Sequence, residues 1–326
     1  MRVLVTGGAG YVGSVSVEAL VAAGHEAIVL DDLSTGQRSA DLAGSRLLVG
    51  SYADRAAVAA ILASARIEAV LHCAARSIVA ESIADPAGYY RDNVGGGLAL
   101  LDALRDAGVA RLVISSTAAV YGRPDALPIP ETAPLAPINP YGETKRTLEA
   151  AAAWYGSAYG LRSVSLRYFN VAGASDRNGE RHSPETHLIP NVLAAADGGE
   201  PVRLFGDDYP TPDGTPIRDY LHVLDLAAAH LAALEATAPG DPRSDAALVC
   251  NLGSGEGASV REVLAAAARV VKRPIPQETA PRRAGDPPIL VAAIGRAADV
   301  LGWRPRRSTL DEMISSAWRR RPGRSA

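Results

Sequence analysis

The pair Tyr141 and Lys145 is the first candidate for chemistry, because the two residues are four positions apart in a segment that predicts a helix. Asn139 is a suitable helix cap, Pro140 suits the first helical position, and apolar residues recur through residue 158. Residues four apart share a helix face, so the Lys145 ammonium would favour the Tyr141 phenolate and lower its pKa from about 10. A phenol tuned in this way transfers protons. The same spacing also arises by chance on amphipathic helices, so the interpretation depends on the elements that would position the pair.

A glycine-rich turn near the N-terminus indicates a bound dinucleotide. Residues 2–6 predict a short strand, and Gly7, Gly10 and Gly13 follow it before a helical segment at 14–23. Glycines are needed there for the tight turn, for approach of the backbone to a pyrophosphate and for packing of the helix on the strand. The first N–H groups of such a helix face the phosphates.

A carboxylate follows this turn where a ribose would bind. Residues 27–31 predict a buried strand that ends in Asp31, roughly 20 positions beyond Gly13. A carboxylate at that position accepts hydrogen bonds from ribose hydroxyls and repels a 2′-phosphate. We therefore expect the cofactor NAD rather than NADP.

Strand and helix patterns alternate through the first half of the chain. Further strands are predicted at 46–49, 68–72, 111–115 and 162–167, and helices at 54–63, 86–107 and 140–158. This alternation predicts an α/β fold with a doubly wound parallel Rossmann sheet and a smaller mixed α/β C-terminal substrate domain. We expect the NAD-binding domain at residues 1–170, with the segment of about 217–252 returning to it, and the substrate domain at residues 171–326.

Ligands of such sheets bind beyond the carboxyl ends of the strands, where Gly10, Asp31, Thr117 and Tyr141 would gather. Thr117 follows the fifth strand and can hydrogen-bond the substrate oxygen that Tyr141 attacks, or it can satisfy the local backbone. Asn93, inside the helix predicted at 86–107, can bond backbone groups and hold a polar layer together. This convergence favours a catalytic role for Tyr141.

Composition excludes several classes of protein. The 326 residues carry a net charge of −3 and are 48% hydrophobic, which is ordinary for a globular protein and gives no reason to expect nucleic acid. The apolar runs are too short to span a membrane, and the N-terminus reaches glycines too early for a signal peptide. Cys73 and Cys250 have no metal-like spacing, so we expect buried thiols and a cytoplasmic location. His182, Glu185 and His187 match no strong metal signature, and we expect no metal.

Six segments resemble the extended short-chain dehydrogenase/reductases, and in particular the UDP-glucose 4-epimerases. They are residues 6–14, 115–122, 141–145, 166–170, 184–190 and 206–220. The last is the most specific, and the resemblance covers essentially the whole chain. It implies an NAD-dependent isomerase that epimerises C4 of a UDP-sugar, UDP-glucose or UDP-galactose, through a transient 4-keto intermediate. It also implies a homodimer, for which the apolar faces of 87–107 and 148–158 are suited.

The resemblance assigns roles to individual residues. The catalytic residues would be Tyr141, Lys145 and Thr117. NAD would contact Gly7, Gly10, Tyr11, Val12, Gly13, Asp31, Asp32, Asn93, Lys145 and Phe169. The nucleotide sugar would contact Thr117, Tyr141, Asn170, Leu188, Arg203, Leu204, Phe205, Arg218, Arg283, Asp286 and Leu290. Uracil would lie against the strand of Phe205, and the bulk of Leu290 would limit the substituent at C2 of the sugar.

Four residues depart from the family pattern. Ser51 replaces an acid near the adenine, Ser77 a lysine near the cofactor phosphates, Gly97 a threonine and Ala293 an aspartate. These departures leave open another nucleotide sugar, such as UDP-glucuronate or an N-acetylated UDP-hexosamine.

Two other classes share the expected fold and cofactor. A nucleotide-sugar dehydratase or decarboxylase requires an extra acid or base just after Thr117, where this chain has Ala118 and Ala119. A non-catalytic NAD sensor has no need of Thr117, Tyr141 and Lys145 together. Both classes are therefore less favoured than a 4-epimerase.

Overall fold

A computed structural model of the chain describes residues 1–182, 185–241, 247–283 and 286–321. Its largest element is a seven-stranded sheet in which every neighbouring pair is parallel, ordered β10-β6-β5-β4-β1-β2-β3. The strands are β1 (Arg2–Thr6), β2 (Glu26–Asp31), β3 (Arg46–Val49), β4 (Ala69–His72), β5 (Arg111–Thr117), β6 (Arg162–Tyr168) and β10 (Ala247–Leu252). The order places β1 between β4 and β2, where the strand order reverses, as expected for a doubly wound Rossmann sheet.

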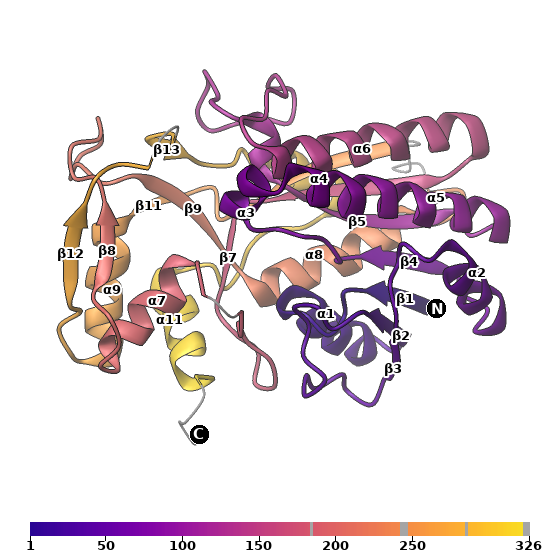
Figure 1. Cartoon of the computed structure of the whole chain (residues 1–326), viewed down its shortest axis with the longest axis horizontal. Coiled ribbons are helices and arrows are strands. Elements are labelled where there is room, and N and C mark those ends of the chain that lie inside the picture. Colours follow the sequence, from indigo (N-terminus) through magenta and orange to yellow (C-terminus); the bar gives the residue numbers. More distant parts are fainter. Residues whose placement is uncertain (183–184, 242–246, 284–285, 322–326) are drawn as a thin grey trace.

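Helices cover both faces of this sheet (Figure 1). One layer contains α1 (Tyr11–Ala22), α8 (Val223–Ala236) and α10 (Gly295–Leu301), and the other contains α2 (Arg55–Ser64), α5 (Gly96–Ala107) and α6 (Pro140–Tyr159). Alternate residues of β1 serve the two layers: Val3 and Val5 pack toward α1 and α8, and Leu4 toward α2, α5 and α6. Burial on both faces explains why the inner strands β1 and β4 are largely apolar.

The helix predicted at 86–107 is interrupted in the structure. It consists of α4 (Pro86–Tyr89), a π-helical turn η1 (Tyr90–Gly95) and α5, and a short helix α3 (Val79–Ala84) precedes it. The interruption is centred near Asn93, which is 3% exposed and points its amide at neighbouring backbone. Single π-helical turns of this kind are frequent at functional sites.

The second half of the chain forms a smaller unit beside the large sheet (Figure 1). Its strands are β7 (Asn170–Ala172), β8 (Val202–Phe205), β9 (Ile217–His222), β11 (Gly257–Ser259), β12 (Gln277–Ala280) and β13 (Ile289–Leu290). Its helices are α7 (Leu188–Ala196), α9 (Val260–Val271) and α11 (Leu310–Arg319), and a short 3₁₀ turn η2 (Ala118–Tyr121) follows β5 in the larger unit. The smaller sheet is mixed, since β9 pairs antiparallel with β11 and parallel with β7 and β13.

The predicted fold class, a parallel Rossmann sheet with a smaller mixed α/β part, is confirmed. Within the segment 217–252, α8 and β10 pack with the large sheet, whereas β9 belongs to the smaller one. Among the residues the structure describes, no helix has both the length and the apolar character that a membrane crossing requires.

Candidate functional site

Local sequence places Tyr141 at the beginning of α6. Asn139 caps the helix by accepting a hydrogen bond from the Gly142 N–H (2.9 Å), and Pro140 is its first residue. A side chain at Gly142 would lie 2.5 Å from the Ala119 carbonyl oxygen, so glycine allows the helix to approach η2 closely. The close approach brings Tyr141 to Thr117, and the two side chains form a hydrogen bond.

The expected effect of Lys145 on Tyr141 is not found. Burial raises the pKa of Tyr141 above its usual value, and the hydrogen bond with Thr117 lowers it only in part. Lys145 is 3% exposed and donates from Nζ to the Ser115 carbonyl oxygen at 2.8 Å. The prediction of a lowered phenol pKa is therefore wrong for the chain alone, because desolvation dominates the pKa of the ring and the Lys145 ammonium is bonded elsewhere.

Burial also changes the acidity of Lys145 itself. It lowers the pKa of this lysine to about 8, although the charges of Cys73 and Glu149 act in the opposite direction. A lysine held by a backbone carbonyl with a pKa near neutrality can change its charge in the working range. The site thus contains a half-buried phenol, a hydroxyl that bonds it and a buried amine.

The glycine turn has the shape that a dinucleotide requires. Gly7 has φ of +72°, and a side chain on it would lie 2.6 Å from the Ala74 nitrogen. A side chain on Gly13 would lie 2.1 Å from the Gly7 oxygen. The backbone is therefore tightly folded before the N-terminus of α1, and Tyr11 and Val12 begin that helix. These residues fit a bound pyrophosphate.

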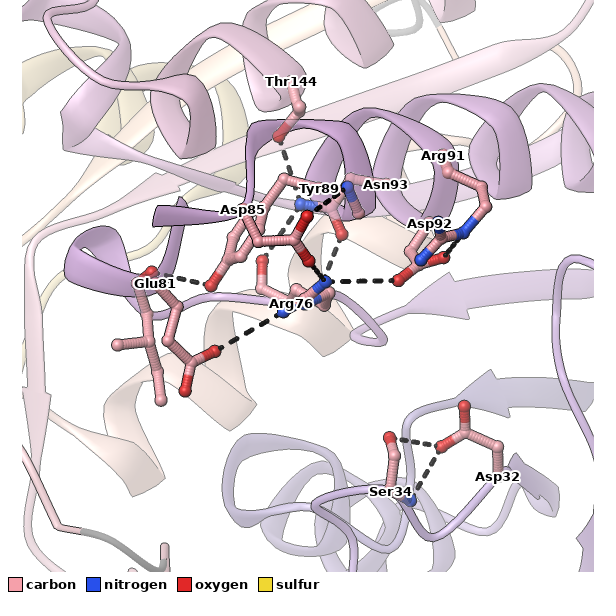
Figure 2. A network of polar contacts seen from close by, with 12 residues as sticks. Asp32, Ser34, Arg76, Glu81, Asp85, Tyr89, Arg91, Asp92, Asn93 and Thr144 are labelled. Atoms are coloured by element: carbon pink, nitrogen blue, oxygen red, sulfur yellow. Dashed lines mark hydrogen bonds and ion pairs between the residues drawn. The ribbon is translucent and has the colours of Figure 1, made fainter. Parts of the chain in front are cut away.

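The two acids after β2 have different surroundings. Asp31 is 6% exposed, and its oxygens accept from the Ala9 N–H (2.9 Å) and the Leu33 N–H (2.8 Å). Burial raises the pKa of Asp31, whereas these backbone bonds lower it. Asp32 is exposed and accepts from the Ser34 N–H and hydroxyl, as Figure 2 shows. Asp31 thus stabilises the turn and retains acceptor lone pairs for a ribose.

Asn93 joins two segments of the site, as predicted from its polarity inside an apolar helix (Figure 2). Its Oδ1 accepts from the Arg76 N–H (2.9 Å), and its Nδ2 donates to the Arg76 oxygen (3.0 Å) and to Thr144 Oγ1 (3.1 Å). Thr144 in turn donates to the Tyr141 carbonyl oxygen at 2.8 Å. The loop after β4 and the first turn of α6 are therefore fixed to each other.

Sequence reasoning missed the side chain of Arg76. It contacts Asp85 at 2.7 Å, Asp92 at 3.7 Å and Glu81 at 3.9 Å, and its guanidinium lies 4.6 Å from the centroid of the Tyr89 ring. Figure 2 shows this cluster beside Asn93. The edge of Tyr89 meets the Tyr141 ring, with centroids 6.5 Å apart. The signal that was available is the run of acids between residues 81 and 92.

A buried ion pair behind β5 was also missed. Arg167 and Glu149 have side chains 4% and 7% exposed, and two bonds of 3.0 and 2.6 Å join the guanidinium to the carboxylate. Glu149 also accepts from Ser116, the neighbour of Thr117. The pair stabilises the end of β5 against α6. No local pattern marks it, because the partners come from α6 and β6.

Several residues predicted to bind the nucleotide sugar lie together in the smaller unit. Arg218 donates to Asp286 Oδ1 (2.6 Å) and to the Pro287 oxygen (2.8 Å), and its neighbour across the sheet is Leu290. Leu290 packs with Phe169, the residue expected to contact NAD. The predicted diphosphate and sugar contacts therefore adjoin a predicted cofactor contact.

A second group surrounds Phe205. The guanidinium of Arg283 lies 4.1 Å from its ring centroid and that of Arg203 lies 5.6 Å away. Leu204 is 3% exposed and packs inward, so any ligand contact from this residue would come from its backbone. Asn170 is exposed at the start of β7, and Leu188 begins α7.

One of the four departures has a structural reason. A side chain at Gly97 would lie 2.7 Å from Leu148 Cδ1, so glycine permits the close approach of α5 to α6. Ser51 accepts from the Ala53 N–H (3.1 Å), and the Ala293 N–H donates to the Ile129 oxygen (2.9 Å). Nothing in the structure explains Ser77.

The glycine turn at β1 and α1, together with Tyr141 and Lys145 on α6, is typical of Rossmann-fold enzymes that use a nicotinamide cofactor. The family model described as "NAD dependent epimerase/dehydratase family" matches residues 3–252. A UDP-glucose 4-epimerase of Corynebacterium glutamicum is 50% identical over 319 residues, 98% of this chain and 95% of that protein. The chain therefore belongs to the NAD dependent epimerase/dehydratase family, among its UDP-glucose 4-epimerases.

Solved structures agree with this assignment. The UDP-glucose 4-epimerase from Brucella ovis in complex with NAD is 45% identical, with a TM-score of 0.93 and 97% of each chain covered. The enzyme from Bifidobacterium longum in complex with NAD+ and UDP is 35% identical, with a TM-score of 0.91 and 98% of each chain covered. The likeness extends over both the large sheet and the smaller unit.

Proposed function

We propose that this chain interconverts UDP-glucose and UDP-galactose with NAD as cofactor, through a transient 4-keto sugar. The observation that carries the proposal is the Tyr141–Thr117 pair at the end of β5, beside the buried Lys145. The absence of an acid or base at Ala118 and Ala119 favours epimerisation over dehydration or decarboxylation.

In the proposed mechanism, Tyr141 takes the proton of the sugar 4-hydroxyl and later returns it. Thr117 bonds the same sugar oxygen and keeps it within reach of the phenol. NAD held at the glycine turn would supply a reversible acceptor for the C4 hydride, and its positive ring would lower the pKa of a nearby phenol. Lys145, whose pKa is about 8, supplies positive charge beside the cofactor while it remains protonated.

The residues assigned to NAD, to the diphosphate and to uracil belong to the same proposal. The glycine turn, Asp31, Asp32, Asn93 and Phe169 would hold NAD, with the larger unit over residues 1–170 as the cofactor domain. Arg218 and Asp286 would orient the diphosphate, and Phe205 between Arg203 and Arg283 would bind uracil by stacking. After hydride removal, a diphosphate held in this way lets the keto sugar turn its other face to the cofactor.

The proposal includes a homodimer in the cytoplasm. Trp154 and Tyr159 on α6 are 74% and 57% exposed, and Leu98 on α5 is 39% exposed, which supports an apolar interface between copies. Cys73 and Cys250 are free thiols, which suits a reducing compartment. Sedimentation equilibrium measures the oligomeric state.

NMR of UDP-galactose with the purified chain and no added NAD tests the function. UDP-glucose should accumulate until equilibrium, because NAD is regenerated in each turnover. Tyr141→Phe should lower turnover by about 10²–10⁴-fold while NAD stays bound. Full activity of that variant, or turnover of UDP-glucuronate in place of UDP-galactose, would contradict the proposal.

A further inference from the structure

A segment after β7 lies against the glycine turn. The Gln37 side chain donates to the Arg181 oxygen at 3.0 Å, and Asn178 donates to the Asp41 oxygen at 2.7 Å. A cavity of about 20 Å³ is lined by residues from both sides, including Tyr11 and His182. The segment is therefore anchored to the cofactor-binding unit and carries several groups that the proposed mechanism does not use.

Two histidines of this segment converge on one carboxylate. Glu180 Oε1 lies 2.6 Å from His182 Nδ1, and Glu180 Oε2 lies 3.8 Å from His187 Nδ1. The two imidazole rings have centroids 5.5 Å apart. One ligand atom from each of these three residues lies within 4.8 Å of the others. Spacing in the sequence did not reveal this group, because it left out Glu180.

Hydrogen bonds hold these side chains but leave one ring nitrogen without an aligned partner. His182 Nδ1 is sealed from solvent and, despite its short distance to Glu180, is not aligned for a hydrogen bond. Imidazole and carboxylate are ligands of zinc, with bonds of about 2.0–2.2 Å, which places tetrahedral ligand atoms roughly 3.3 Å apart. One ligand atom of each residue already lies within 4.8 Å of the other two, so side-chain rotations would bring the three donors to that separation.

Glu185 approaches only one of the two histidines, whereas Glu180 approaches both. His187 Nδ1 and Glu185 Oε1 form a hydrogen bond of 2.7 Å. Each carboxylate also accepts the backbone N–H groups of the two residues that follow it. Glu185 is therefore the outer partner that orients His187 through Nδ1, Nε2 of His187 would face the ion, and a water molecule would take the fourth metal position.

We propose that Glu180, His182 and His187 bind a divalent transition-metal ion of the zinc class. Binding would release any protons held by the histidines, since neutral imidazole is the ligand. The ion would link residues 180 and 187 beside Tyr11, whose hydroxyl donates to the Gly173 oxygen at 2.6 Å. This site is structural and separate from the chemistry proposed for Tyr141.

Metal titration of the full chain, freed of any affinity tag and treated with a chelator, tests the proposal. One equivalent of Co²⁺ should give the visible absorption of a tetrahedral site, and Zn²⁺ should displace it. Glu180→Gln, His182→Asn and His187→Asn should each weaken Co²⁺ binding by at least about 100-fold, because even outer partners contribute 10–100-fold. Glu185→Gln changes an outer partner and should weaken it by about 10–100-fold, and exposed Glu256→Gln should leave it unchanged.

Wild-type affinity in all three ligand variants, or no tetrahedral absorption in the wild-type chain, would overturn the proposal. Thermal unfolding shows whether each variant is folded. If a variant fails to fold, NMR of the unaltered chain tests the site instead. Zn²⁺ should shift the imidazole signals of two histidines. The signal of His25, which lies beside the N-terminal amine, should not move. Equal shifts of His25 would indicate non-specific binding and would refute the site.

Discussion

Two regions hold their candidate side chains in different ways. The first is the end of β5 with the start of α6, and the second is strand β8 with the loop that faces it. Around Tyr141, backbone carbonyls, a buried amine and the Asn93–Thr144 link fix each group by bonds that exclude solvent. Around Phe205, two guanidinium groups stack on a ring, and the Arg203 side chain is 64% exposed. Buried bonds give fixed geometry, whereas exposed stacking leaves the surface able to adapt to a ligand.

The largest effect should follow from breaking the buried support of the first region. Arg167→Met leaves the Glu149 carboxylate buried without its charge partner, which should lower the free energy of unfolding by about 3–5 kcal/mol. Urea denaturation measures the change. Arg146→Met is the matched control, since Arg146 pairs with Glu143 on the surface of the same helix and should cost less than about 1 kcal/mol. Similar losses of unfolding free energy in the two variants would show that the buried ion pair stabilises the protein no more than the surface pair does.

The buried amine should make stability depend on pH. The folded pKa of Lys145 is about 8, below the unfolded value of about 10.4, so between these values the unfolded chain holds one more proton. The free energy of unfolding should therefore rise with pH, by about 1–2 kcal/mol from about pH 8 to 9.5 relative to Lys145→Met. Below about pH 7 both states are protonated and this contribution is flat. Parallel unfolding curves for the two proteins from pH 8 to 9.5 would contradict the assignment.

A smaller effect should come from the link between Asn93 and α6. Thr144→Val keeps the side-chain shape but removes the bonds to the Tyr141 carbonyl and to Asn93, so kcat should fall on the order of tenfold with KM nearly unchanged. Thr147→Val is the control, because Thr147 bonds Glu143 within the same helix and takes no part in the Asn93–Thr144 link. Steady-state kinetics with UDP-galactose compares them, and equal losses would mean that the link does not position Tyr141.

The smallest effect should come from the adaptable surface. Arg283→Lys removes the planar group over Phe205 and should raise KM for UDP-galactose about threefold to fivefold, from a loss of about 0.5–1 kcal/mol, with kcat unaltered. Arg282→Lys should not change KM, since Arg282 stacks on Tyr209 instead. A fall in kcat for Arg283→Lys would show that Arg283 is needed for fixed geometry during catalysis, as the groups around Tyr141 are.

Local signals explain what the sequence predicted well. The Asn139 cap and Pro140 at the first helical position are both present, because each involves residues within one helical turn. The glycine turn and the parallel strands likewise follow from short patterns. Strands β7, β11 and β13 have two or three residues each, too few for a periodic pattern, so only pairing with β9 reveals them.

The parts of the site that were not predicted depend on contacts between distant segments. Arg76 approaches Asp92, and Glu180 approaches His187, through turns whose geometry no spacing rule describes. The prediction of a lowered pKa for Tyr141 failed for the same reason, since desolvation depends on all the groups packed around the ring. Residue types identified the groups that can transfer protons, but burial decided whether the pKa of each group is raised or lowered.

The strand β10 has a consequence for anyone wishing to divide this protein. The polypeptide passes from the large sheet to the smaller unit after β6, returns at α8 and β10, and leaves again for β11. A fragment cut at residue 170 would lack an edge strand and the helix that covers α1, exposing apolar surface that invites aggregation. The chain also crosses between the two units several times. These connections restrain the units from opening widely and would keep a bound cofactor in place between catalytic cycles.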